Sequence, residues 1–469
     1  MISASSCKST ITTAIIGLTL ISPLNTCADE IKPLSQQLRG SAVGKWLSIW
    51  GDYGFGIGYN QTNEKLADYP GINHAIDYSD NIRFGLRSKP IDVLTFDISM
   101  AYNNVKTVSY RDMGQGYSST YLAMHAAFPE SYPYVSSTSS TEVDSLDLYR
   151  GYATLEIMDK RLKLTAGRRP TGENVPLSIL QNKDDADDRG NPSLLESFHY
   201  DGFSLSYAPE NLSFLGSHWR VGYGHSYQTG LNQNQDPLYD SQILTMALMP
   251  INLDNAKVWF QWLRGFEIYD SVPMTGTLFG NPPSPTNIGS IDWFSTGASG
   301  TLKPGYGTLN GFADFGMSVI RPNGNTSPTA GFQGLMSGSF LNPSQPQDQT
   351  GYAVYTGIRY DLPSLTKIGF EYNYGSKFWV SSTAGGKTGT RGSVFEPFVI
   401  QEINFKPVTS VFQKTFFRAG YQYFDYEYTG SNTWIGAPVK ISSINSGMIL
   451  LQAPTPHEYK IYGAFEIHF

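Results

Sequence analysis

Residues Val93 to Tyr102, with the sequence VLTFDISMAY, alternate between two kinds of side chain at almost every step. One parity is apolar and comprises Leu94, Phe96, Ile98, Met100 and Tyr102. The other parity is small or polar and comprises Thr95, Asp97, Ser99 and Ala101. Because successive side chains of a β-strand point to opposite faces of the sheet, this pattern predicts a strand with one apolar face and one polar face.

The same period of two recurs along the chain, for example in residues 82–87 and 368–375. It predicts about sixteen strands. These segments are residues 46–60, 81–88, 91–102, 144–157, 161–169, 200–207, 217–227, 241–250, 255–265, 289–299, 308–319, 351–361, 366–377, 394–405, 414–428 and 457–469. Within 144–157 the alternation slips, because Leu148 shares its parity with Arg150. A β-bulge would produce that slip.

The connections between these segments alternate in length. Long ones are residues 61–80, 103–143, 170–199, 228–240, 266–288, 320–350, 378–393 and 429–456. Short ones are residues 88–90, 158–160, 208–216, 250–254, 300–307, 362–365 and 406–413. Outer-membrane barrels have an even number of antiparallel strands, short periplasmic turns and longer outer loops. The sequence therefore predicts an all-β transmembrane barrel of about sixteen strands, within a range of 14–18.

Composition agrees with a barrel. The chain has 47 Gly, 30 Tyr and 26 Phe, only 16% of its residues are charged, and beyond the leader no stretch is apolar enough for a membrane helix. In lipid only helices and closed barrels satisfy the backbone, so a membrane protein with this sequence has to be a barrel. A formal net charge of −7 argues against a nucleic-acid partner.

The N-terminus has the features of a secretory signal peptide. Lys8 precedes an apolar stretch at residues 11–24, and Thr26 and Ala28 are small residues suited to cleavage after Ala28. We expect a signal peptide at 1–28, a short periplasmic segment at 29–44 and the barrel at 45–469. Acylation at Cys27 is the alternative, although residues 24–27 resemble a lipobox poorly. Both cysteines of the chain lie in the leader, so the exported chain would hold no disulfide, and we expect no cofactor or metal.

The C-terminus alternates to its last residue. Its apolar parity comprises Tyr459, Ile461, Gly463, Phe465, Ile467 and Phe469. A terminal aromatic after alternating hydrophobic residues resembles the signal that the barrel-assembly machinery recognises in outer-membrane proteins. The resemblance implies that Phe465, Ile467 and Phe469 direct assembly into the bacterial outer membrane.

A second resemblance spans more of the chain. Residues 164–170 (LTAGRRP), residues 191–195 (NPSLL) and the pair Asp201-Gly202 resemble an uncharacterised, domain-of-unknown-function family of porin-like proteins. The resemblance implies an outer-membrane barrel and no particular solute. A long N-terminal coiled coil, which some members carry, has no counterpart in residues 29–44.

The function of a pore lies in the width and charge of its narrowest point. The third outer loop, 170–199, carries Asp184, Asp185, Asp187 and Asp188, followed by Arg189. In general porins of sixteen strands the third loop folds into the lumen and opposes wall arginines. By that analogy we predict a constriction between the acidic loop and the wall residues Arg83, Arg87, Arg150, Arg168 and Arg220. The alternative is a solvated loop tip that binds divalent ions loosely.

The preferred interpretation is a porin, a water-filled channel for passive diffusion of small polar solutes. Expected partners are outer-membrane lipid and lipopolysaccharide. A homotrimer is a possible assembly of such a barrel. No G-x-S-x-G or H-E-x-x-H motif is present, so we expect no enzyme. The alternatives are a surface adhesin or receptor that uses its long loops, and a dedicated transporter of hydrophobic compounds.

Aromatic residues at segment ends are expected to form girdles at the two membrane interfaces. They are Tyr59, Tyr102, Tyr207, Tyr227, Trp262, Tyr360, Trp379 and Tyr428.

Overall fold

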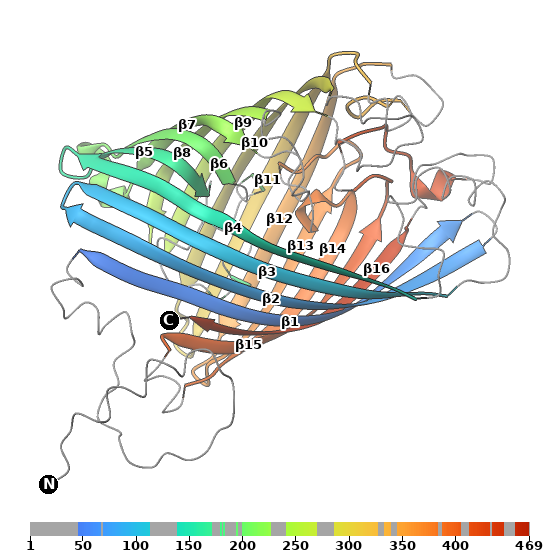
Figure 1. Cartoon of the computed structure of the whole chain (residues 1–469), viewed down its shortest axis with the longest axis horizontal. Helices are drawn as coiled ribbons and strands as arrows, with labels where there is room; N and C mark the ends of the chain where they lie inside the picture. The colour runs from blue at the N-terminus through green and yellow to red at the C-terminus, as the bar shows by residue number, and fades with distance from the viewer. Residues whose placement is uncertain are drawn as a thin grey trace, which may run out of the picture.

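The computed structural model is a closed barrel of sixteen antiparallel strands, each hydrogen-bonded to its neighbours in the chain, with β1 paired to β16 (Figure 1). It confirms the expected fold class and strand number. The structure describes residues 46–66, 69–112, 138–170, 179–180, 182, 194–195, 199–226, 241–269, 286–326, 333–338, 345–382, 387–404, 412–431, 434–444 and 455–468. The predicted leader and the segment 29–44 lie outside these residues. Among the described residues, no helix has the length and apolar character to cross a membrane.

The strands are β1 (Leu47–Leu66), β2 (Tyr69–Ile91), β3 (Leu94–Asp112), β4 (Thr138–Ile157), β5 (Leu162–Pro170), β6 (His199–Tyr207), β7 (His218–Ser226), β8 (Ser241–Leu253), β9 (Ala256–Tyr269), β10 (Asn287–Leu302), β11 (Thr308–Pro322), β12 (Gln349–Asp361), β13 (Thr366–Gly375), β14 (Gly392–Glu402), β15 (Lys414–Tyr426) and β16 (His457–His468). Within the described residues, three short 3₁₀ helices lie between strands: η3 (Glu210–Leu215), η5 (Lys387–Gly389) and η6 (Ile441–Ser443).

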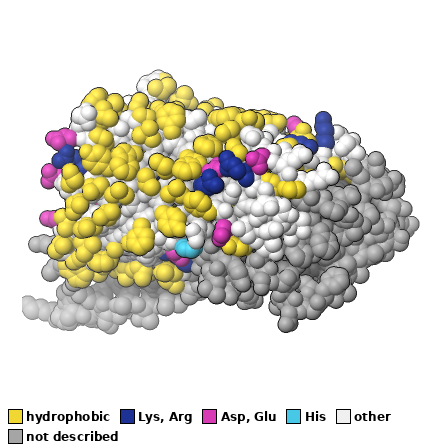
Figure 2. Space-filling view, turned by 90° about the horizontal axis from the view of Figure 1, so that it is seen from above, with side chains coloured by type: hydrophobic (Ala, Val, Ile, Leu, Met, Phe, Trp, Pro, Cys, Tyr) yellow, Lys and Arg dark blue, Asp and Glu magenta, His cyan; other side chains and the backbone are white. Residues whose placement is uncertain are grey.

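The apolar parity of each strand faces outwards. In β3, Phe96 is 46% and Ile98 50% exposed, whereas Asp97 between them is 2% exposed. In β13 the exposed residues are Ile368 and Phe370, and Glu371 is buried. Figure 2 shows the resulting surface, with hydrophobic side chains spread over the outer face and charged side chains at its margins. The pattern is that of a barrel in lipid, whose outside is apolar and whose inside is polar.

A β-bulge explains the slip of alternation in β4. Ser99 pairs with Arg150 and the next residue, Met100, pairs with Leu148, so Tyr149 is the extra residue of the bulge. The bulge turns Leu148 outwards, where it is 39% exposed, and keeps Arg150 buried inside. The explanation offered by the sequence is confirmed.

Two of the predicted long connections differ in their bounds. β3 continues to Asp112 and β4 begins at Thr138, inside the predicted connection 103–143. The first long connection, 61–80, is wrong: β1 and β2 continue as a regular hairpin up to the pair Leu66 and Tyr69. Residues 60–65 of this hairpin have the polar sequence NQTNEK. Hydrophobic patterning therefore gave no sign of it.

Short connections follow β2, β4, β6, β8, β10 and β12 as predicted, although the first lies at residues 92–93 and the predicted 88–90 belong to β2. Most of the predicted turn 406–413 lies outside the described residues. The turn at Met158–Lys160 has positive φ at all three residues.

Candidate functional site

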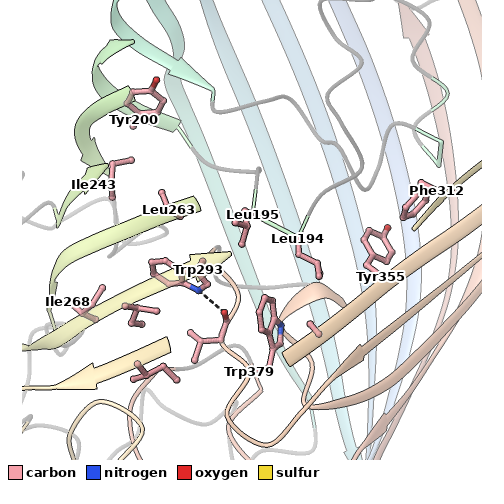
Figure 3. Close-up of a cluster of buried hydrophobic side chains, with 14 of the residues drawn as sticks. Leu194, Leu195, Tyr200, Ile243, Leu263, Ile268, Trp293, Phe312, Tyr355 and Trp379 are labelled. Atoms are coloured by element: carbon pink, nitrogen blue, oxygen red, sulfur yellow. Dashed lines mark hydrogen bonds between the residues drawn. The ribbon is translucent and has the colours of Figure 1, made fainter. Parts of the chain in front are cut away.

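One side of the lumen is filled by parts of the outer loops. Buried residues Leu194 and Leu195, Leu335 and Met336, and Trp379 and Val380 come from the loops after β5, β11 and β13. They pack against inward side chains of β8 to β15, such as Trp293 and Tyr355. Figure 3 shows this cluster, in which the Trp293 indole nitrogen donates to the Val380 carbonyl oxygen over 2.7 Å. The outer loops therefore narrow the lumen from this side.

The loop between β5 and β6 reaches the short-turn end of the barrel. Asn182 Nδ2 donates to Glu402 Oε1 over 2.8 Å, and Lys367 Nζ donates to Asn182 Oδ1. Both wall residues lie within one residue of a short-turn end, at the last position of β14 and the second of β13. Asn182 adopts a left-handed conformation with φ 57°, which asparagine tolerates better than most residues.

Neighbouring wall residues hold the same loop by its backbone. Arg359 Nη1 donates to the carbonyl oxygen of Ile179, and Arg418 Nη1 donates to that of Leu180 over 3.0 Å. Glu402 also forms ion pairs with Lys367 at 2.7 Å and Lys414 at 3.3 Å. These contacts fix residues 179, 180 and 182 on the inner wall of β12 to β15.

The C-terminal part of the loop between β5 and β6 is hydrogen-bonded to the middle of strand β11. The Leu194 backbone nitrogen donates to Asp314 Oδ2 in β11 over 2.5 Å. Asp314 is buried and also accepts hydrogen bonds from Ser295 and Trp259. Residues on both sides of the segment 183–193 are thus anchored inside the barrel.

The loop between β13 and β14 is held by a buried cation. Lys387 Nζ contacts carboxylate oxygens of Glu371 and Glu396 on the inner wall. Tyr355 and Tyr462 donate to the same two carboxylates, each over 2.7 Å. Burial alone would lower the pKa of Lys387, but the two carboxylates outweigh it and hold the pKa above its ordinary value. Lys387 therefore remains charged and fastens the loop to the wall.

The opposite side of the lumen contains a cavity of about 300 Å³. Its lining comes from β1, β2, β3, β4, β15 and β16 and includes Asp52, Arg83, Tyr149, Arg418 and Glu466. Arg83 Nη2 lies 2.8 Å from Asp52 Oδ2, and Arg418 Nη2 lies 2.7 Å from Glu466 Oε1. The cavity is therefore bounded by two ion pairs, one between β1 and β2 and the other between β15 and β16.

Four of the five predicted wall arginines have inward positions. Arg83 lines the cavity, Arg87 pairs with the buried Asp97 at 2.8 Å, and Arg150 stacks its guanidinium 5.1 Å from the Trp50 ring. Arg220 has the same parity as the buried glycines Gly222 and Gly224 of β7, so it also faces the lumen.

The prediction for Arg168 is wrong. It shares its parity with the exposed Leu164 and forms a bidentate ion pair with Asp201, which shares the parity of the exposed Phe203. Arg168 therefore lies on the outer face. Its neighbour Arg169 points inwards, where its Nη1 donates to the buried Ser204 hydroxyl. The error arose because a run of two arginines leaves the parity open.

The remaining predicted residues divide as follows. Phe465 and Ile467 lie in β16 opposite Phe55 and Tyr53 of β1, on the side of the exposed Ile461. The acidic cluster Asp184, Asp185, Asp187 and Asp188, with Arg189 and Phe469, lies outside the described residues. Trp379 was expected in an interfacial girdle, and this is wrong, because it is fully buried with its indole nitrogen donating to the Thr388 carbonyl oxygen.

Sequence reasoning missed the residues that anchor the loops. They are Arg359, Lys367, Lys387, Glu371, Glu396, Glu402, Lys414 and Arg418. A signal was available for most of them, because each strand residue in this set has the inward parity of its strand. Charged residues on the inward parity near the short turns can be identified without any structure.

A family model matches residues 73–469, and its description is "Protein of unknown function (DUF3373)". The chain belongs to this family. The match confirms the resemblance, noted from residues 164–202, to an uncharacterised family. Membership in DUF3373 assigns no activity, since the family is defined without one. No curated protein matches the chain.

Three of the solved structures to which this DUF3373 protein is similar come from Pseudomonas putida, Comamonas acidovorans and Vibrio cholerae. The low-pH structure of Pseudomonas putida OprB has 9% identity and a TM-score of 0.46, covering 92% of this chain and 96% of that one. The anion-selective porin from Comamonas acidovorans has 8% identity and a TM-score of 0.43, covering 90% and 99%. The trimer form of Vibrio cholerae OmpT has 10% identity and a TM-score of 0.42, covering 90% and 100%. At these values the likenesses carry no argument about function, and the fold rests on the strand pairing.

Proposed function

We propose that this protein is an outer-membrane porin, a passive channel for small polar solutes. The observation that carries the proposal is the charged cavity of about 300 Å³ in the lumen, bounded by β1 to β4, β15 and β16. Its walls carry Asp52, Arg83, Arg418 and Glu466. Charged groups persist there because water reaches them, whereas on the lipid face an Arg or Lys at the midplane costs about 2–4 kcal/mol.

The outer surface supports placement in a membrane. Phe260, Phe294, Phe315, Ile358 and Ile368 all have exposed fractions between 39% and 56%, and all have the outward parity of their strands. A contiguous apolar surface of this kind is unfavourable in water and marks contact with another apolar phase. The loop-length alternation assigns the long loops to the outside of the cell and the short turns to the periplasm.

The constriction is proposed to lie between the loop after β5 and the wall of β1 to β4. Asn182 and Leu194 are anchored inside the barrel, and they flank the segment that contains the four aspartates. Placing those aspartates opposite Arg83 and Arg87 would create a transverse field across the water path. Such a field orients dipolar solutes and disfavours apolar ones.

The test is single-channel conductance of the refolded full-length chain in planar bilayers. A porin gives stepwise, voltage-tolerant conductance that scales with bulk salt. The Lys387→Met variant loses the cation that fastens the loop after β13, so its conductance should be larger or noisier. Refolded, heat-modifiable barrel without conductance in either form would overturn the proposal.

A transporter of hydrophobic compounds is the second candidate, and one observation favours it. Apolar side chains from the outer loops, including Leu194, Leu335 and Trp379, form a cluster inside the lumen. These side chains are at most 3% exposed, so their apolar surfaces are occupied by each other. A transporter would need this cluster to open. Uptake of a hydrophobic probe into proteoliposomes without ion conductance would favour this candidate over the porin.

A further inference from the structure

An ionic cluster lies on the outer face of the barrel, where β9, β10 and β11 meet. Arg321 Nη1 contacts Asp292 Oδ2, and Arg264 Nη1 lies 3.6 Å from the same oxygen. The other carboxylate oxygen of Asp292 accepts a hydrogen bond of 2.9 Å from the Trp262 indole nitrogen. The Asp292 side chain is 4% exposed, while those of Arg264 and Arg321 are 35% and 41% exposed.

Strand parity shows that the cluster faces away from the lumen. Asp292 shares its parity with the exposed Phe294, and Arg264 shares its parity with Phe260 and Phe266. Arg321 has the parity of the exposed Phe315. On the inward parity of the same strands lie Trp293, Leu263 and Ile320, all buried. The two arginines therefore stand among apolar side chains that face lipid.

The height of the cluster matches the outer boundary of the membrane. Asp292 lies ten residues from Leu302, at the short-turn end of β10. At about 3.3 Å per residue and a strand tilt of about 40°, ten residues span roughly 25 Å along the membrane normal, the height of the apolar band of such barrels. An outward arginine costs about 0–1 kcal/mol near the interface, compared with about 2–4 kcal/mol at the midplane. The cluster thus lies at the long-loop margin of the band.

The cluster has unused capacity for an anion. Two guanidinium groups share one carboxylate, which leaves one positive charge. The side chains of Arg264 and Arg321 are 35% and 41% exposed, so part of each guanidinium group remains accessible from outside the barrel. The nearby carboxylate of Glu267 accepts a hydrogen bond of 2.7 Å from the Tyr269 hydroxyl, and within the described part of the chain it forms no ion pair with Arg264 or Arg321. Paired guanidinium groups bind phosphate oxygens with favourable geometry.

We infer that Arg264 and Arg321 bind a phosphate group of an outer-leaflet lipid, the phosphorylated headgroup of lipopolysaccharide. Acyl chains of that lipid would lie below the arginines, along Phe260, Phe294 and Phe315. Asp292 contacts both guanidinium groups, and its negative charge offsets one of their two positive charges. The inference rests on the proposed outer-membrane placement and orientation, and it is independent of whether the lumen conducts.

Binding of fluorescent lipopolysaccharide to the refolded full-length chain in detergent tests the site. The double variant R264Q/R321Q should bind at least about tenfold more weakly, a change equal to roughly 1.4 kcal/mol. Arg161→Gln is the matched control, because Arg161 pairs with Glu210 at the short-turn end of the barrel. The lipopolysaccharide affinity of this variant should equal that of the wild type. Heat-modifiable mobility establishes that each variant is folded.

A second variant and two further ligands sharpen the result. Asp292→Asn retains an acceptor for Trp262 and removes the competing negative charge, so it should bind lipopolysaccharide at least as tightly as the wild type. Dephosphorylated lipid A should bind the wild type and R264Q/R321Q equally. Inorganic phosphate at millimolar concentration should fail to displace the lipid, because it has no acyl chains for Phe260 and Phe294.

Equal lipopolysaccharide binding by folded R264Q/R321Q and wild type overturns the inference. Full displacement by inorganic phosphate also overturns it, because it would identify a free-anion site. Conductance of the same preparations is measured in parallel. A non-conducting wild type that binds lipopolysaccharide through these arginines would contradict the porin proposal alone, and a conducting wild type without arginine-dependent binding would contradict this inference alone.

Discussion

Asn182 and Glu402 are 220 residues apart in the chain, and the Asn182 Nδ2 atom donates to Glu402 Oε1 over 2.8 Å. One residue belongs to the connection between β5 and β6, and the other ends β14 at a short turn. The pair therefore shows that an outer loop passes down the lumen to the opposite end of the barrel. Lys367 and Lys414 surround the same carboxylate and reinforce the contact.

Replacing Asn182 with glycine should loosen this loop and enlarge the pore. Glycine keeps the left-handed backbone conformation of position 182 without strain, so the change removes only the side-chain bonds to Glu402 and Lys367. We expect a higher single-channel conductance and a free energy of unfolding lower by about 1–3 kcal/mol. Planar-bilayer recordings and urea unfolding measure the two effects.

Asn211→Ala, at an exposed position of η3, serves as the control and should change neither quantity. If N182G unfolds less readily than the wild type or conducts identically, the loop is held by other contacts and Asn182 is not its anchor.

Much of the fold was accessible from the sequence because lipid imposes one rule on every strand. The outward parity must be apolar, so residues such as Phe96 and Ile98 in β3 identify their strand unambiguously. Alternating loop lengths then indicate a simple up-and-down order of strands and distinguish the short-turn end of the barrel from the long-loop end. The hairpin beyond Gln61 escaped prediction because it continues past the apolar band, where polar residues can form a ladder without leaving a hydrophobic pattern.

The lumen was less accessible, because its contacts join residues that are far apart in the chain. The residues next to Asn182 in the sequence do not indicate its hydrogen bond with Glu402. Trp379 is buried only because a loop turns inwards. Arg168 and Arg169 show a further limit, since a single-residue uncertainty in register exchanges the lipid face and the lumen face. Besides the inward wall arginines that were predicted, inward charges near short turns are a further feature of this site that sequence alone could have supplied.

Topology can be checked by labelling single cysteines with an impermeant maleimide on intact cells. Both native cysteines lie in the expected leader, so an introduced cysteine would be unique in the exported chain. Cysteines at Ser137, Asn325 or Asn432, in the long connections, should react. Cysteines at Lys89 or Asp159, beside short turns, should not react until the cells are permeabilised. The reverse pattern would invert the barrel and remove the lipopolysaccharide site from the outer leaflet.

Deletion of Phe469 should impair assembly while leaving export intact. The preceding outward residues Phe465 and Ile467 lie against β1 at the seam that closes the barrel, so the end of β16 contributes to closure. We expect less heat-modifiable barrel in the membrane fraction and processed but unassembled or degraded chain in the periplasm. Deletion of the single residue Lys303, in an exposed turn, is the control for general instability. Wild-type barrel yield after loss of Phe469 would contradict the assembly role.

Charge changes at the cavity wall should alter ion preference with opposite signs. Arg83→Gln leaves the Asp52 carboxylate without its ion-pair partner and should raise cation preference, whereas Asp52→Asn should lower it. The double variant D52N/R83Q should return the reversal potential in a KCl gradient close to the wild-type value. Arg161→Gln, outside the lumen, should leave it unchanged. If the reversal potentials of both single variants equal the wild-type value, the ion path lies away from this cavity.

The acidic segment of the third outer loop offers the sharpest test of the constriction. If Asp184, Asp185, Asp187 and Asp188 line the conduction path, replacing all four with Asn removes four negative charges at nearly constant volume. Cation preference should then fall, and it should fall further at low salt, because the Debye length grows from about 10 Å at 0.1 M to about 30 Å at 0.01 M. Asp159→Asn with Asp254→Asn, at exposed short turns, controls for the general change in charge. An unchanged reversal potential at low ionic strength would leave the four aspartates as a solvated loop tip and place the constriction at Arg83, Arg87 and the neighbouring wall.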